Sequence, residues 1–260
     1  MCDFILKYIL QLDMWCRHCL NIIDFNFKGE RQMGSKIDTA KELVESARYA
    51  LGSDTFLSDF VDMWAFQHTN QFPPKAKLRQ NSAFMDLCCK LSRVLQELML
   101  SGEHDPISLL MTNEKSTVKG FDFYPSPASV SEIMKGLLLE PISLSRSDSI
   151  SLYEPTAGPA GLIFEQIKMV AYSRTNRANP LEGVVIRVED INPIAVKAFL
   201  IQYSFLINFL TNEIGREPQP DFVQIVTCDV LSRAQGSVSY YLSSPKKFDE
   251  NELFLCSSRG

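Results

Sequence analysis

The stretch Tyr153-Glu154-Pro155-Thr156-Ala157-Gly158-Pro159-Ala160-Gly161 decides how this chain is expected to fold. Residues 149–153 before the turn are typical of a short buried strand, and the apolar run 162–167 after it begins a helical stripe. Small residues let the backbone approach a ligand, and the following helix begins with free N–H groups. The turn is therefore predicted to cradle a cofactor, although a strand, a glycine turn and a helix also occur as plain architecture.

Two further apolar runs, 184–188 and 222–226, end in the sequences Glu189-Asp190-Ile191-Asn192-Pro193 and Cys228-Asp229-Val230-Leu231. We predict strands over 149–154, 184–189 and 222–228, alternating with helices over 160–172 and 193–211. Such alternation favours an α/β fold with a parallel sheet and crossover helices. Ligands bind such sheets at the carboxyl ends of the strands, so the three motifs are expected to meet at one edge.

Apolar residues at helical spacing predict a bundle over residues 33–104, ahead of the alternating part. Its first helix covers 35–51, its second begins at Asp54 or Thr55, and its third begins near Asn81 or Ser82. Residues 105–119 have mixed polarity and are predicted to be a linker to the core, 120–260. Residues 1–32 precede the first well-formed helix signal and are interpreted as an N-terminal extension.

Composition and charge narrow the class of protein. The net charge of −5 and pI near 5.3 predict no strongly basic surface, so contact with DNA would be local or delegated to a partner. Seven cysteines, an odd number, favour the reduced thiols of a cytoplasmic protein. Charged residues interrupt the apolar N-terminal segment, and neither a membrane span nor a signal peptide is predicted.

The segment Cys16-Arg17-His18-Cys19 has the residue types of half a zinc site. A second pair of ligands at a suitable spacing is missing from the sequence. A helix with two cysteines near one face is therefore the preferred interpretation, and no metal is predicted.

Four motifs stand in a fixed order: Phe121-Asp122-Phe123-Tyr124-Pro125-Ser126-Pro127, the turn from Glu154 to Gly161, Asp190-Ile191-Asn192-Pro193 and Cys228-Asp229-Val230-Leu231. In this order they resemble the S-adenosylmethionine-dependent N6-adenine DNA methyltransferases. The nearest likeness is to the modification subunits of type I restriction-modification systems. The resemblance covers roughly residues 119–249, and four ordered motifs are more specific than any one of them.

The resemblance implies a Rossmann-like methyltransferase core, here with an incomplete sheet, preceded by a helical bundle. It also implies a site for S-adenosyl-L-methionine formed by Phe123, Tyr124, Glu154, Thr156, Ala157, Gly158, Gly161, Asp190 and Asp229. Residues 154–161 would surround the methionine part, Asp190 would accept the ribose hydroxyls, and Asp229 would face the adenine amino group. Pro159 stands where the family more often has Gly or Ser, and it removes one backbone donor from the cradle.

The resemblance further implies DNA as a partner, through a separate specificity subunit and other restriction-modification proteins. However, the catalytic Asn/Asp-Pro-Pro-aromatic motif of the family does not occur in the 260 residues, so no catalytic residue is assigned. We therefore expect a DNA adenine-N6 methyltransferase that is catalytically incomplete as given. The alternative is a non-catalytic regulatory protein that binds the cofactor, DNA or a partner. A weaker third interpretation is methylation of another amine, such as a protein glutamine.

Overall fold

The computed structural model describes residues 31–112, 147–159 and 162–243 of the chain. Within these ranges the elements are α2 (Arg31–Leu51), α3 (Phe56–Thr69), α4 (Ala76–Arg79), α5 (Ser82–Leu100), α6 (Pro106–Thr112), β1 (Ile150–Glu154), α9 (Ile163–Ser173), β2 (Val184–Asp190), α10 (Pro193–Ile214), β3 (Phe222–Cys228) and β4 (Gln235–Ser243). The fold is mixed α/β, as predicted. Phe123, Tyr124, Gly161 and the segment 16–19 lie outside the described residues, as does the predicted extension except for its last two positions.

The described strands form one sheet in the order β1-β2-β3-β4. β1, β2 and β3 are parallel, with Leu152 beside Ile186 and Ile186 beside Val223, whereas β4 runs antiparallel to β3. The three predicted strands and both predicted crossover helices are confirmed, with small shifts at their ends. Strand β4 was not predicted. Because β1, β2 and β3 run in the same direction, their carboxyl ends lie at one edge of the sheet.

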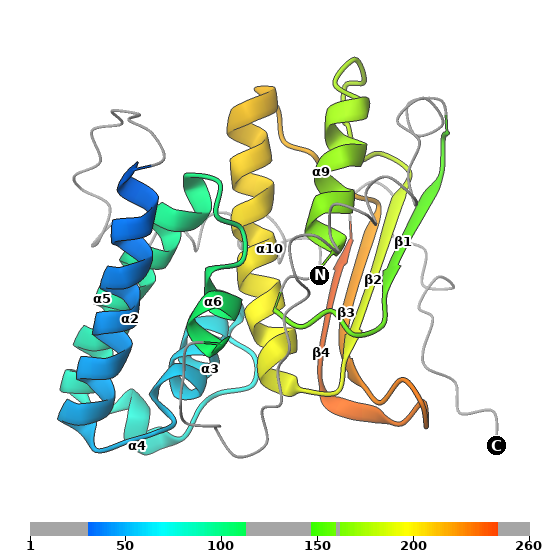
Figure 1. Cartoon of the computed structure of the whole chain (residues 1–260). Helices are drawn as coiled ribbons and strands as arrows, with labels where there is room; N and C mark the ends of the chain where they lie inside the picture. Colours follow the sequence, from blue (N-terminus) through cyan, green and yellow to red (C-terminus); the bar gives the residue numbers. More distant parts are fainter. Residues whose placement is uncertain (1–30, 113–146, 160–161, 244–260) are drawn as a thin grey trace.

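Helix α10 is the centre of the molecule, lying between the sheet and the bundle (Figure 1). Its residues Val196, Phe199 and Tyr203 belong to the core beneath the sheet, whereas Ile201 and Phe205 belong to the core of the bundle. Burial on both sides explains why the helix is apolar all round. By length and composition α10 could cross a membrane, but 67% of its most apolar window is buried, as in the core helix of a soluble protein.

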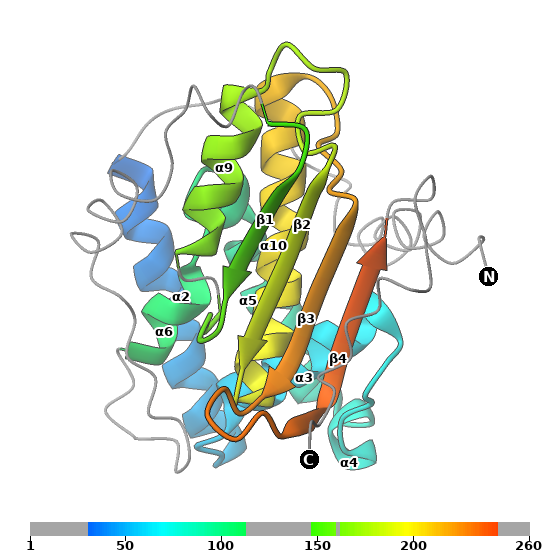
Figure 2. The same cartoon turned by 90° about the vertical axis from the view of Figure 1, so that its right-hand side faces the viewer.

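Figures 1 and 2 show α9 and α10 covering the same face of the sheet. Each helix connects two neighbouring parallel strands, so the chain steps across the sheet in one direction from β1 to β3. This arrangement brings the turn after β1, Asp190 after β2 and Asp229 after β3 to neighbouring positions along the carboxyl edge. It is the arrangement that the alternation of strands and helices predicted.

The bundle packs α2, α3 and α5 around a core that includes Phe60, Trp64 and Leu95. Asn81 is the N-cap of α5, as predicted, and its side chain accepts a hydrogen bond from the backbone N–H of Phe84 at 3.1 Å. Residues 106–112 of the predicted linker form α6, whose Ile107 joins this core. A helix of seven residues is too short to show a sustained apolar period, which is why the sequence did not predict it.

Candidate functional site

The turn after β1 folds back against the end of β2. The backbone N–H of Ala157 donates to the carbonyl oxygen of Glu189 at 3.1 Å, and the N–H of Gly158 donates to Asp190 Oδ2 at 2.9 Å. Gly158 has a φ of +58°, in the left-handed region that favours glycine. Ala157 and Gly158 are buried and Thr156 is exposed. The predicted need for glycine in this turn is therefore confirmed at Gly158.

Glu154 ends β1 immediately before this turn. Burial raises the pKa of its carboxyl group, and a hydrogen bond from the backbone of Thr156 opposes that rise. The residue is half-buried. Glu154, Thr156, Ala157 and Gly158 all lie at the end of β1 or in the turn that follows it.

Asp190 lies at the end of β2, at the position that was predicted for it. Besides the contact with Gly158, its Oδ1 accepts the N–H of Asn192 at 2.8 Å. Asn192 is the N-cap of α10 and accepts the N–H of Ile194 at 2.9 Å, with Pro193 at the first helical position. Each Asp190 oxygen has a second lone pair, so the carboxylate can accept further donors from a ligand.

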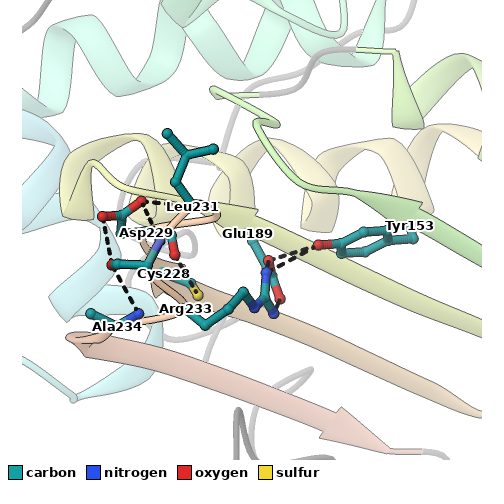
Figure 3. A network of polar contacts seen from close by, with 8 residues as sticks. Tyr153, Glu189, Cys228, Asp229, Leu231, Arg233 and Ala234 are labelled. Atoms are coloured by element: carbon teal, nitrogen blue, oxygen red, sulfur yellow. Dashed lines mark hydrogen bonds and ion pairs between the residues drawn. The ribbon is translucent and has the colours of Figure 1, made fainter. Parts of the chain in front are cut away.

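Asp229 follows β3 and organises a tight turn into β4 (Figure 3). Its carboxylate accepts the N–H of Leu231 at 3.0 Å and the hydroxyl of Ser232 at 2.7 Å, and its own N–H donates to the Ala234 carbonyl. The Ser232 hydroxyl and these backbone donors lower the pKa of the Asp229 carboxyl. Leu231 is 95% exposed, and Ile191, which directly follows Asp190, is 68% exposed. Each acidic residue is thus followed by an apolar side chain that faces solvent.

A second network, which the sequence did not predict, joins the ends of β1, β2 and the β3–β4 turn (Figure 3). Arg233 donates to both oxygens of the Glu189 carboxylate, at 2.7 and 2.8 Å, and the Tyr153 hydroxyl donates to Glu189 Oε2 at 2.8 Å. Burial alone would raise the pKa of Glu189, but the hydrogen bonds from Arg233 and Tyr153 outweigh burial and lower it. Arg233 also has a φ of +60°, an uncommon conformation for a residue other than glycine. Arg233 therefore fixes the β3–β4 turn to the end of β2.

One sequence signal pointed toward this network. Glu189 directly precedes Asp190 in a strand, so its side chain must point to the opposite face of the sheet. An acidic residue at the buried end of a strand needs a basic or hydrogen-bonding partner. Tyr153 and Arg233 could not be identified as the partners from the sequence, because they are separated from Glu189 by 36 and 44 residues.

Replacing Arg233 by Ala is expected to lower the free energy of unfolding by about 1–2 kcal/mol, because buried Glu189 loses its cation. The half-exposed position of Arg233 keeps the loss below that of a fully buried pair. Urea unfolding of R233A, E189Q and the double variant would measure the coupling between the two side chains. R216A is the matched control, because Arg216 is exposed and donates to the Arg177 carbonyl. This substitution should change the free energy of unfolding by less than about 0.5 kcal/mol. A coupling near zero would contradict a fixing role for Arg233.

Metal binding receives no support from this edge. Among residues 31–112, 147–159 and 162–243, no three His, Cys, Asp or Glu side chains come together in a group that could hold a metal ion. Glu154 and Asp190 are the last residues of β1 and β2, and Asp229 directly follows β3, so the three acidic residues lie at the carboxyl ends of three neighbouring strands.

Comparison of the chain with models of known protein families, with curated proteins and with solved structures finds no match.

Proposed function

We propose that this chain binds S-adenosyl-L-methionine along the carboxyl edge of β1, β2 and β3, as part of a DNA adenine-N6 methyltransferase of the restriction-modification type. The observation that carries the proposal is the turn after β1, folded onto the end of β2 by the hydrogen bond from Gly158 to Asp190. It supports the order of motifs that resembles this family, because the turn and Asp190 form one unit. A Rossmann-like methyltransferase core is proposed on the same grounds.

The charge of the edge favours this cofactor over a phosphate-bearing nucleotide. Phosphate cradles present free backbone N–H groups, whereas the Gly158 N–H is bound to a carboxylate of the protein itself. Glu154, Asp190 and Asp229 add negative charge, and the Arg233 guanidinium is paired with Glu189. A ligand with a sulfonium, an ammonium group and ribose hydroxyls suits such an edge, whereas phosphates would be repelled.

Apolar side chains beside the carboxylates supply a surface for the purine ring. Ile191 and Leu231 are exposed after the ends of β2 and β3. Exposed apolar groups next to polar ones are typical of ligand sites, where flat apolar faces cover a ring and polar groups orient it. In the proposed complex, Asp190 accepts the ribose hydroxyls and Asp229 accepts the adenine amino group.

Methyl transfer to adenine requires more than cofactor binding. The target base must leave the duplex, stack on an aromatic side chain and have its amino group oriented toward the methyl donor. The Asn/Asp-Pro-Pro-aromatic motif that does this in the family is absent from the 260 residues. The alternative function is a cofactor-binding protein that acts without transferring a methyl group by itself. With a net charge of −5, DNA contact is proposed to occur through a partner, in the cytoplasm.

Isothermal titration calorimetry tests the ligand. We expect S-adenosylmethionine to bind the wild-type chain, and ATP and NAD to give no measurable heat. Asp190→Asn should weaken the binding of S-adenosylmethionine by about tenfold or more, because the acceptor for the ribose loses its charge. Asp86→Asn, at an exposed position in α5, is the control and should bind like the wild type. Binding of ATP or NAD at least as tight as that of S-adenosylmethionine would refute the proposal.

Transfer of a labelled methyl group from S-adenosylmethionine to adenine-containing DNA separates the two functions. Retained cofactor binding with zero incorporation would support the non-catalytic alternative for the chain on its own. Incorporation that is lost in the Asp190→Asn variant would instead show that the 260 residues carry a complete catalytic site.

A further inference from the structure

Gln202 is a fully buried amide in the middle of the apolar helix α10. Burying an amide is costly unless its groups are hydrogen-bonded. Its Nε2 donates to the carbonyl oxygen of Pro159 at 2.9 Å and to Asp105 Oδ1 at 3.0 Å, and its Oε1 accepts the N–H of Ile107 at 3.1 Å. One side chain therefore contacts the turn after β1 and the beginning of α6.

These contacts add a second attachment of the turn to the one at Asp190. Gly158 donates to Asp190 at the end of β2, and the next residue, Pro159, accepts from Gln202 on α10. Pro159 is buried, so the loss of this donor from its carbonyl oxygen would be costly. The turn is thus held between β2 and α10, and its conformation depends on both contacts.

We propose that Gln202 is a positioning residue that holds the turn in its ligand-binding conformation and couples that conformation to the docking of α6. The identity of the ligand rests on the proposed function, whereas the effect on the turn does not. Ile107 of α6 lies in the core of the bundle, so the coupling extends from the carboxyl edge into the helical part of the chain. Because coupling is reciprocal, a ligand on the turn stabilises the docking of α6.

Removing the amide leaves two buried backbone groups without this partner, the Pro159 carbonyl and the Ile107 N–H, while Asp105 Oδ1 still accepts the N–H of Ser108. Unsatisfied buried groups favour local rearrangement that lets water reach them. The turn should therefore open more often, and its backbone N–H groups should exchange faster with solvent. Gln202→Leu tests this directly because it keeps a side chain of similar size.

The experiment measures amide hydrogen exchange and S-adenosylmethionine affinity in the full chain. In Gln202→Leu we expect exchange at Ala157 and Gly158 to rise, and affinity to fall, by about tenfold or more. Ile201→Ala is the matched control, since Ile201 is the preceding residue of α10 and packs in the bundle core without these contacts. Ile201→Ala should destabilise the chain. Well below the unfolding temperature it should nevertheless change both amide exchange at the turn and the affinity for S-adenosylmethionine by less than about twofold.

The outcomes separate this inference from the proposed cofactor. If Gln202→Leu and Ile201→Ala change exchange at the turn equally, Gln202 does not position it and the inference is overturned. A second outcome is that the wild type binds S-adenosylmethionine and Gln202→Leu loosens the turn without lowering the affinity. In that case the ligand does not use this conformation of the turn, and the inference is again overturned. If the turn loosens and the wild type binds no S-adenosylmethionine, the positioning of the turn is supported and the proposed cofactor is refuted.

Discussion

Gly183→Ala is expected to lower the free energy of unfolding by about 3 kcal/mol, combining a strained backbone with a steric clash. Gly183 has a φ of +77°, and a Cβ added there would lie 1.9 Å from the carbonyl oxygen of Asp148. The glycine lies where two strands begin: its carbonyl accepts the N–H of Ile150 at 3.0 Å, and its N–H donates to Asp221 at 3.0 Å. A methyl group must push the start of β1 away from β2.

Gly215→Ala is the matched control for this substitution. Gly215 has a φ of +74°, nearly that of Gly183, but a Cβ added there meets nothing within 4 Å. Gly215 follows the C-terminus of α10. Its replacement by Ala should lower the free energy of unfolding by only the cost of a left-handed backbone, about 1–2 kcal/mol. The difference between the two variants in urea unfolding therefore measures the clash with Asp148. Equal losses would contradict the close approach of the two strands at this point.

The sequence predicted the elements whose signals are local. The β-branched run of β2 predicted a strand with Asp190 at its carboxyl end. Asn81 and Gly158 were predictable because helix capping and left-handed backbone each favour few residue types. The parallel pairing of β1, β2 and β3 followed from the alternation of strands and helices, whereas their order in the sheet was not predicted.

What the sequence did not predict depends on contacts between distant residues. Val238 and Tyr240 alternate with serines in β4, a pattern that is visible, but its antiparallel pairing with β3 depends on the turn built by Asp229. Arg233 could have paired with any nearby carboxylate, and only the fold brings it to Glu189. Gln202 is a polar residue in an apolar helix, which indicates a buried contact without identifying the partner.

His104 and Asp105 are expected to give opposite dependences of stability on pH. Burial raises the pKa of Asp105 from 3.8 to about 6, although hydrogen bonds from Ser108 and Gln202 oppose the rise. Burial, with the nearby charge of Lys168, lowers the pKa of His104 from 6.5 to about 4. The folded chain thus binds a proton at Asp105 more tightly than the unfolded chain does, and a proton at His104 less tightly.

Proton linkage gives the direction in which each group changes the stability of the chain with pH. Asp105 contributes stability below about pH 4, and this contribution is lost as pH rises through about 6. His104 contributes stability above about pH 6.5, and this contribution is lost as pH falls through about 4. Each of the two pKa shifts corresponds to about 3 kcal/mol in the free energy of unfolding. Between about pH 4 and 6 the contributions of Asp105 and His104 change in opposite directions, so they largely cancel in the wild type.

Single substitutions should remove that cancellation. Asp105→Asn keeps an acceptor for Gln202 and leaves only the contribution of His104. Relative to the double variant, its free energy of unfolding should therefore rise by about 3 kcal/mol between pH 4 and 6.5. His104→Phe keeps an aromatic contact with Phe209, whose ring centre lies 4.5 Å from that of His104. In this variant stability should fall by a similar amount over the same range. Urea unfolding in steps of half a pH unit measures both slopes, with the double variant as the reference for all other titrating groups. Slopes of the same sign in the two single variants would show that these neighbours do not titrate in opposition.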